Sequence, residues 1–301
     1  MTSSAVGTER RLGGRTRRFF RRTLAALVAA GVDFLVGGAF AIERYAGLVR
    51  DTKDFDVFVR PRDRGRLLAT LAAVGCETEE PYPHWLAKAR CAGDVVDVIF
   101  NSGNAMCEVD DGWFAHATGG RVLGVPVRFV PAEELLWSKA FVQERERFDG
   151  ADVVHLLHAR GPDLDWDRLL ARFGEHWRVL YAHVILFGYV FPSERRRVPR
   201  AVMAELGRRL ADEARPPRGP RVCRGTLLSR TQYATEVGEG GYADARVVPL
   251  GHMTPATAAS WTAAGARAAP AGAAGGERAA RITRRVTHAS SADGTARPSR
   301  R

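Results

Sequence analysis

Two aspartates occupy alternate positions, Asp54 and Asp56, in the apolar run from Asp54 to Val59. The run is rich in aromatic and β-branched residues and therefore predicts a strand, on which both carboxylates point to the same face. The two side chains are separated by about 7 Å along such a strand and repel each other unless a cation lies between them. Oxygen-only ligands of this kind suit Mg²⁺ or Mn²⁺, so the pair predicts a metal site.

A third carboxylate, Asp97, lies in the later apolar run 94–100. An unpaired charge in such a strand would be costly, which favours a functional role for Asp97. Asp94 stands at the start of the run and is better explained as a turn residue. We therefore expect Asp97 to join the two earlier aspartates from a neighbouring strand.

A glycine pair, Gly37 and Gly38, separates the short apolar run 33–36 from the good helix formers of 39–45. This order predicts a buried strand, a turn and a helix. The glycines leave bare backbone N–H groups at the positive end of the helix dipole. Such a turn is suited to bind an anion, most commonly a phosphate.

The ordered set of a glycine pair, an Asp-x-Asp strand and Asp97 in a later strand resembles the nucleotidyltransferase superfamily related to DNA polymerase β. It is most similar to the small bacterial branch of minimal or abortive-infection type nucleotidyltransferases. These carry a Gly-Gly-x-Ala turn and a Thr-Lys-Asp-hydrophobic-Asp strand, which here correspond to Gly37 to Ala41 and Thr52 to Asp56. The motifs cover residues 32–100, and the resemblance extends more loosely to about residue 160.

The resemblance implies transfer of a nucleoside monophosphate from a nucleoside triphosphate to an acceptor hydroxyl, with release of pyrophosphate. Asp54 and Asp56 would hold two Mg²⁺ or Mn²⁺ ions, and Asp97 would share one metal and could act as the base. The Gly37-Gly38 turn would hold the β- and γ-phosphates. One ion would lower the pKa of the acceptor and the other would neutralise the leaving group.

Further nucleotide contacts implied by the resemblance are Thr52 and Lys53 of the strand motif and a lysine on a later helix, Lys139. In the similar branch this lysine is followed by an arginine and aspartate cluster near the triphosphate. The corresponding residues here are Arg145, Arg147, Asp149 and Asp152. Gly38 stands where many superfamily members have a serine, which removes one phosphate contact.

The acceptor stays open, because superfamily members modify small molecules, proteins and RNA with the same three carboxylates. One alternative function is a toxin-like enzyme that modifies an RNA end. Another is a catalytically degenerate module that binds a nucleotide or a partner without reacting.

The pattern of apolar runs predicts an α+β fold, with a nucleotidyltransferase-type mixed β-sheet of about five strands and flanking helices, followed by a helical C-terminal domain. Strands are expected at 33–36, 54–59, 85–91, 95–100 and 125–130. Helices are expected at 21–30, 39–45, 61–75, 132–144, 150–159, 166–173, 176–189 and 199–213. The predicted divisions are a basic disordered tail (1–22), the nucleotidyltransferase core (23–130), a helical domain (131–215), a linker and fold-back segment (216–250) and a disordered Ala/Gly/Arg tail (251–301).

The net charge of +11 belongs to the two ends of the chain, since residues 1–22 and 251–301 each carry +6. These basic tails could contact RNA weakly through its phosphates, although disordered, solvated ends are the favoured explanation. Arg17-Arg18 before an apolar segment superficially resembles a twin-arginine export signal, but cleavage there would remove the glycine turn. Four cysteines without metal-site spacing favour reduced thiols, and no apolar run reaches the ~18 residues of a membrane span. We therefore expect a cytoplasmic protein without membrane contact.

Overall fold

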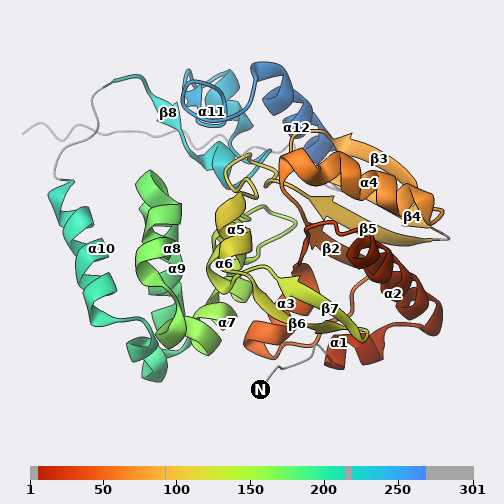
Figure 1. Cartoon of the computed structure of the whole chain (residues 1–301). Helices are drawn as coiled ribbons and strands as arrows, with labels where there is room; N and C mark the ends of the chain where they lie inside the picture. The colour runs from red at the N-terminus through yellow and green to blue at the C-terminus, as the bar shows by residue number, and fades with distance from the viewer. Residues whose placement is uncertain (1–5, 92, 214–218, 269–301) are drawn as a thin grey trace, which may run out of the picture.

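The computed structural model of the chain describes residues 6–91, 93–213 and 219–268. At its centre lies a mixed seven-stranded sheet in the order β3-β4-β5-β2-β1-β7-β6 (Figure 1). The strands are β1 Leu35–Val36, β2 Asp54–Phe58, β3 Glu77–Tyr82, β4 Leu86–Cys91, β5 Asp94–Ile99, β6 Thr118–Val122 and β7 Val125–Phe129. Strands β2 and β5 are parallel, as are β1 and β7, and the other neighbours are antiparallel.

Helices flank this sheet and continue beyond it. The first group is α1 Val6–Arg11, α2 Gly14–Ala29, α3 Gly38–Ala46, α4 Arg64–Ala73 and α5 Asp111–Ala115. The second group is α6 Ala132–Ala140, α7 Gly150–Arg160, α8 Trp166–Phe173, α9 Trp177–Val190 and α10 Arg200–Asp212. A last segment contains β8 Val222–Cys223, α11 Ala234–Gly238, β9 Ala243–Asp244 and α12 Pro255–Ala268. The predicted mixed sheet with flanking helices and a helical region after it is confirmed.

The two faces of the sheet differ in chemistry. On one face Phe55 and Val57 of β2 and Val96 and Val98 of β5 are buried, and helices α2 and α4 lie over this part of the sheet (Figure 1). The alternate positions of the same two strands carry Asp54, Asp56 and Asp97. The apolar face therefore supplies the stability of the fold, and the opposite face is left to form a site.

The N-terminal segment is helical rather than a disordered tail. The prediction of disorder over residues 1–22 is wrong for the described part, 6–22, and residues 1–5 lie outside the described residues. The ring of Phe20 packs 4.8 Å from that of Phe55, between ring centroids. The buried apolar positions of α2 follow helical spacing: Phe19, Phe20, Leu24 and Leu27. The arginines between them obscured this pattern in the sequence.

Three further elements depart from the predictions. Strand β3 is almost fully exposed and β6 reads Thr-Gly-Gly-Arg-Val, so neither shows the apolar alternation by which the other strands were predicted. Helix α12 lies within the predicted disordered tail 251–301, which is therefore wrong for its described part, while residues 269–301 lie outside the described residues. Figure 1 shows α12 beside α4 and β3, which come from a much earlier part of the sequence.

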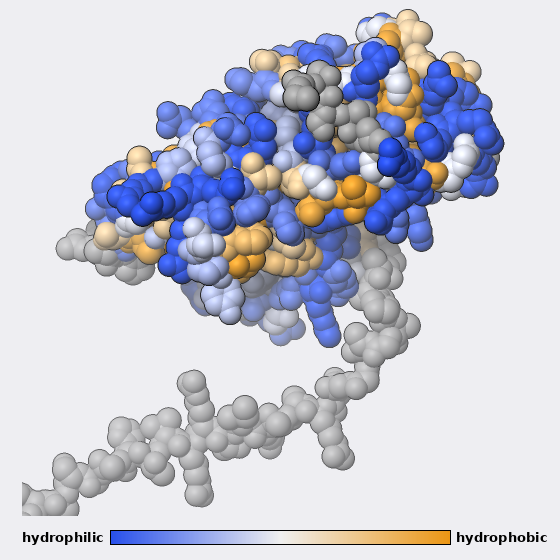
Figure 2. Space-filling view, turned by 90° about the horizontal axis from the view of Figure 1, so that it is seen from below, coloured by the Kyte–Doolittle hydropathy of each residue, from blue (hydrophilic) through white to orange (hydrophobic). Residues whose placement is uncertain are grey.

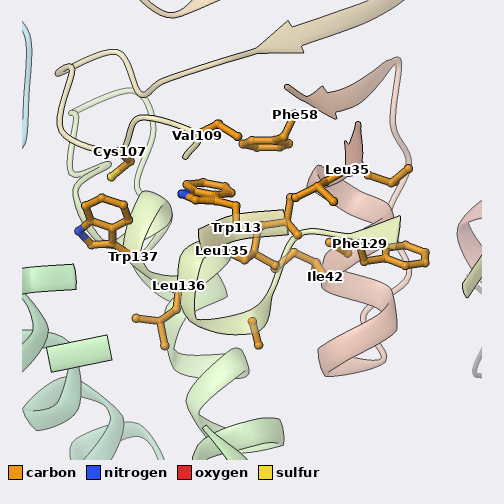
Figure 3. Close-up of a cluster of buried hydrophobic side chains, with 14 of the residues drawn as sticks. Leu35, Ile42, Phe58, Cys107, Val109, Trp113, Phe129, Leu135, Leu136 and Trp137 are labelled. Atoms are coloured by element: carbon orange, nitrogen blue, oxygen red, sulfur yellow. The ribbon is translucent and has the colours of Figure 1, made fainter. Parts of the chain in front are cut away.

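An aromatic core joins the sheet to the helical region (Figure 3). The indole of Trp113 on α5 is fully buried and stacks on Phe58 of β2 at 5.5 Å between ring centroids. On its other side Trp137 of α6 lies at 6.5 Å. This core fixes α6, and the polar residues that α6 carries, against the acid-bearing face.

The described surface is predominantly hydrophilic when seen from below, with apolar side chains in small separate groups (Figure 2). None of the helices within the described ranges combines the length and the apolar character needed to cross a membrane.

Replacing Asp110 by alanine should lower the free energy of unfolding by about 1 kcal/mol at pH 7. Asp110 Oδ1 accepts a hydrogen bond from the Trp113 N–H at the start of α5, at 3.2 Å, and from Arg172 Nη2 of α8, at 2.9 Å. The Arg172 hydrogen bond holds the pKa of Asp110 below its usual value of 3.8. This stabilisation is therefore present above that pH and is lost as the pH falls through the lowered pKa. Urea denaturation at pH 7 and at about pH 3 should show the difference shrinking, and a constant difference would contradict the assignment.

Candidate active site

A pocket of about 670 Å³ opens on the acid-bearing face of the sheet. Its floor comes from β2, β5 and β4, and one wall comes from the first turn of α3. The opposite walls come from α6 with the loop that follows it and from residues 226–230 with α12. The pocket therefore gathers segments from the whole length of the chain, and its size suits a nucleotide-sized ligand.

Asp56 and Asp97 lie side by side on the pocket floor, because they are directly paired in the parallel register of β2 and β5. Burial and then the charge of Asp97 raise the pKa of Asp56 from 3.8 to about 6. Burial also raises the pKa of Asp97, although Lys88 Nζ of β4 lies 2.6 Å from Asp97 Oδ1 and opposes the shift. Burial is thus the main cause of both shifts, and a bound cation would favour the ionised form of the two adjacent carboxylates.

The third acid, Asp54, begins β2 and is exposed. Among the described residues no group of three or more His, Cys, Asp and Glu side chains is placed to hold one metal ion together. The structure brings Asp56 and Asp97 together, and the charge of the exposed Asp54 acts on both of them and raises their pKa values further. The donor set of partly buried carboxylate oxygens fits Mg²⁺ or Mn²⁺, since both prefer oxygen ligands.

The glycine turn lies directly beside Asp56. Gly38 has a positive φ of 53°, and a Cβ at this position would lie 1.7 Å from Asp56 Oδ2. Only glycine therefore permits this close approach of the α3 N-terminus to the carboxylate. The N–H of Gly37 donates to the carbonyl oxygen of Asp56 at 3.0 Å, so it is used by the sheet and is not bare as expected. Gly38 lines the pocket, and its turn leads into the first amides of α3.

The other residues of the strand motif lie before β2. Thr52 Oγ1 donates to the carbonyl oxygen of Asp54 at 2.6 Å, and Lys53 is exposed. The pocket lining, as far as the described residues form it, includes neither of them, nor Gly37. Thr52 orders the start of the strand, and a nucleotide contact by either residue stays a prediction.

The helix lysine and its cluster do come together. Lys139 Nζ of α6 lies 3.0 Å from Asp149 Oδ2 and 2.7 Å from Asp152 Oδ2, and Arg147 Nη2 lies 2.8 Å from Asp149 Oδ2. Burial opposes ionisation of Asp149, but the Arg147 hydrogen bond and the Lys139 charge outweigh it and lower its pKa. The positive charges of Lys139 and Arg147 also act on Asp56, where they partly oppose the rise in its pKa. These two residues therefore face the acid pair. Arg145 is absent from the pocket lining formed by the described residues.

The sequence analysis missed several residues that complete the pocket. Arg50 pairs with Asp152, and Lys88 pairs with Asp97. The chain contains only three lysines, and the other two, Lys53 and Lys139, were already candidate site residues. This scarcity was a signal that could have identified Lys88 as well. For Arg50, no comparable signal exists.

Residues 226–230 and α12 form one wall of the pocket. Asn104 Nδ2 donates to the carbonyl oxygen of Leu227 at 2.7 Å, and Arg230 Nε lies 3.3 Å from Glu144 Oε1. The ring centroid of Trp261 on α12 lies 4.8 Å from that of Tyr82 and 5.5 Å from that of Trp85. Leu227 and Arg230 belong to the predicted linker and fold-back segment 216–250, and through these contacts they lie against the body of the chain. The aromatic cluster of Tyr82, Trp85 and Trp261 also lines the pocket.

Replacing Gly38 by alanine should destabilise the chain more than replacing Gly47, the matched control at the other end of α3. Both glycines have positive φ, which costs about 1–2 kcal/mol for an alanine. Nothing lies within 4 Å of a Cβ at Gly47, whereas Gly38→Ala must also displace the Asp56 carboxylate. We expect an additional loss of at least about 1 kcal/mol by urea denaturation for Gly38→Ala. Equal losses would mean that the turn and Asp56 are not in contact.

No protein-family model matches the sequence, and no curated protein matches it. Solved structures with a comparable arrangement include the antibiotic-resistance factor ANT(2'')-Ia, with 19% identity and a TM-score of 0.41, over 57% of this chain and 98% of that chain. The lincosamide antibiotic adenylyltransferase LnuA, solved with lincomycin bound, shares 13% identity with a TM-score of 0.35, over 48% of this chain and 96% of that chain. A nucleotidyltransferase-like protein from Paracoccidioides brasiliensis shares 16% identity with a TM-score of 0.32, over 56% and 91%.

Proposed function

We propose that this chain is a metal-dependent nucleotidyltransferase, which moves a nucleoside monophosphate from a nucleoside triphosphate to an acceptor hydroxyl and releases pyrophosphate. The observation that carries the proposal is the placement of Asp56 and Asp97 side by side on a pocket floor, beside the Gly38 turn and facing Lys139. Paired acids, a phosphate turn and a facing cation are the parts that this chemistry needs, because it depends on positioning and charge.

The proposed metal site consists of Asp56 and Asp97, joined by Asp54 when its exposed side chain turns inward. Two Mg²⁺ or Mn²⁺ ions held there would lower the pKa of the acceptor hydroxyl and neutralise the leaving pyrophosphate. Because Lys88 Nζ donates to Oδ1 of Asp97, the proposed metal contact belongs to Oδ2 of that residue.

The triphosphate in this proposal lies against the Gly38 turn. The amides and positive dipole end of α3 bind its terminal phosphates, and Lys139 with Arg147 adds positive charge from the opposite wall. Gly37, Thr52 and Lys53 then shape the turn and the start of β2 next to the nucleotide. Asp97 accepts the proton of the acceptor hydroxyl, a role that its raised pKa supports.

The acceptor then lies on the β4 side of the acid pair. In phosphoryl transfer the attacking and leaving oxygens are roughly in line, so the acceptor approaches from the side away from the Gly38 turn. That side of the pocket carries Tyr82, Trp85 and Trp261. Aromatic rings favour an acceptor that presents a flat ring or the apolar face of a sugar.

One observation favours RNA as the acceptor. Arg17, Arg18 and Arg21 of α2 are exposed and line a second hollow, and helix formation fixes their charges in one array. If this array positions RNA, labelling of RNA should fall steeply with rising salt.

Another observation favours the non-catalytic alternative. Lys88 already pairs with one carboxylate oxygen of Asp97. In addition, no group of three or more acids among the described residues converges on one metal position. A binding module of this kind would take up the triphosphate without transferring label.

The test is incubation of the purified chain with each α-labelled nucleoside triphosphate and Mg²⁺ or Mn²⁺. A cell extract separated into protein, RNA and small-molecule fractions supplies the acceptors. The double variant Asp54→Asn with Asp56→Asn is the control. Label in one fraction with the wild type alone would support transfer and identify the acceptor class. Triphosphate binding without label in any fraction would favour the binding module, and label transferred by the double variant would refute the metal assignment.

A further inference from the structure

Two cysteines that are far apart in the sequence meet at the edge of the sheet. Cys76 immediately precedes β3, and Cys91 is the last residue of β4. Glu77 is paired with Arg90 in the antiparallel register of these strands, so Cys76 and Cys91 are the next opposed positions. Their separation of fifteen positions gave no motif in the sequence, where all four cysteines were interpreted as unconnected thiols.

The two thiols are in contact and differ in their surroundings. Cys76 is buried, and burial together with the adjacent Cys91 thiol, to which it is hydrogen-bonded, raises its pKa to about 11. Cys91 is partly exposed, and Arg22 Nη2 of α2 donates to its sulfur at 3.3 Å. Reactive thiols characteristically combine access to solvent with a neighbouring cation. Cys91 has both, and Cys76 lies directly behind it.

The geometry of an antiparallel pair suits a disulfide. Directly opposed residues have Cα atoms about 4.5–5.5 Å apart, and disulfides span about 4.4–6.8 Å. Both cysteines are reduced in this structure. Closing the bond therefore requires side-chain rotation and no rearrangement of the strands.

We propose that Cys76 and Cys91 form a site of reversible oxidation, at which a peroxide converts the two thiols into an intramolecular disulfide. The Cys91 sulfur first attacks one peroxide oxygen, which breaks the O–O bond, leaves a sulfenic acid on Cys91 and releases one water. The Cys76 sulfur then displaces the hydroxyl group from the Cys91 sulfur, which forms the S–S bond and releases a second water with the Cys76 proton. The two thiols lose two electrons in total, the peroxide gains them, and a dithiol reductant reverses the change.

The other two cysteines provide an internal contrast. Cys107 is 1% exposed, and burial raises its pKa to about 12. Cys223 is partly exposed on β8, but its partner in the register with β9 is Asp244 and not a second cysteine. We therefore expect oxidation to stop after the loss of two of the four thiols.

The experiment is titration of the full-length wild-type chain with hydrogen peroxide, followed by thiol counting, intact mass measurement and peptide mapping. The expected result is a count that falls from four to two, a mass loss of about 2 Da and one cross-linked peptide pair containing Cys76 and Cys91, all reversed by dithiothreitol. Cys107→Ser should behave like the wild type, and Cys91→Ser should lose the cross-link. Arg22→Gln should slow the oxidation about threefold or more, since it removes the neighbouring cation.

Several results would overturn the proposal. These are a cross-link that involves Cys107 or Cys223, a disulfide between two chains, or irreversible oxidation of Cys91 without a cross-link. Four remaining thiols at peroxide concentrations that oxidise free glutathione would overturn it as well. Peptide mapping of the wild type settles these outcomes even if a variant fails to fold.

Discussion

Replacing Asp56 by asparagine should lower nucleotidyl transfer at least about 1000-fold while leaving the chain as stable as the wild type or more stable. The activity is lost because the variant removes a charged oxygen ligand from the centre of the proposed metal site. The stability is kept because the ionised Asp56 carboxylate destabilises the folded chain, and its raised pKa of about 6 reflects this cost.

The pH dependence of stability checks the same residue. At pH 7 a shift from 3.8 to about 6 corresponds to a cost of about 3 kcal/mol, at ~1.4 kcal/mol per pKa unit. Since the folded-state pKa is raised, the folded chain binds the extra proton first, and this cost disappears as the pH falls from 7 toward 4. Urea denaturation should therefore show Asp56→Asn more stable than the wild type by about 1–2 kcal/mol at pH 7, with the advantage lost near pH 4.

Mg²⁺ supplies a control without a transfer assay. It should raise the melting temperature of the wild type and not that of Asp56→Asn, because an ion that binds only the folded state stabilises it. Asp167→Asn, an exposed change on α8, should respond like the wild type. Full transfer activity in Asp56→Asn, or a loss of stability at pH 7, would remove Asp56 from the proposed centre.

Replacing Glu134 by glutamine should lower the free energy of unfolding by about 3–5 kcal/mol. The side chain of Glu134 on α6 is fully buried between two arginines of α8. Arg168 Nη1 lies 2.6 Å from each of its carboxylate oxygens, and Arg172 Nε lies 3.1 Å from Oε1. Removing the negative charge takes one carboxylate away from two guanidinium groups in a poorly hydrated place, where, among the described residues, Arg168 keeps only Glu133 and Asp165 as acidic partners and Arg172 keeps only Asp110.

Glu205 of α10 is the matched control for this change. It also pairs with two arginines, Arg208 and Arg209, but on the exposed surface. Thermal melting should show a large downward shift for Glu134→Gln and no shift for Glu205→Gln, because exposed ion pairs contribute little. Similar shifts for the two variants would mean that the buried network does not hold α6 against α8.

The positions of Asp56 and Asp97 on one face of the sheet could be predicted from two simple signals in the sequence. Alternation in β2 placed its aspartates on one face, and an acid inside an apolar run marked Asp97 as a neighbour. The close approach of Gly38 to Asp56 could not be predicted, since it depends on the register of β1 against β2. The exposed position of Asp54 was missed for the same reason, because alternation gives the direction of a side chain and not its burial.

The elements missed in the sequence lack an apolar period or carry a competing signal. Strand β3 is polar because it lies at the exposed edge of the sheet, and β6 contains two glycines. The first half of helix α2, before the predicted start at residue 21, was obscured by its arginines, although its buried face is regular. The contact of Trp261 with Tyr82 and Trp85 joins positions nearly 180 residues apart, which no local pattern can indicate.

The wall formed by residues 226–230 and Trp261 has a consequence for biosynthesis. The sheet, the acids and the Gly38 turn are all encoded before residue 130, so they leave the ribosome first. The pocket gains its last wall only when α12 has been translated and has packed on Tyr82 and Trp85. A nascent chain, or one cut short before residue 226, would present the acid pair in an open groove. Translation and packing of α12 are therefore also the steps that close the candidate site.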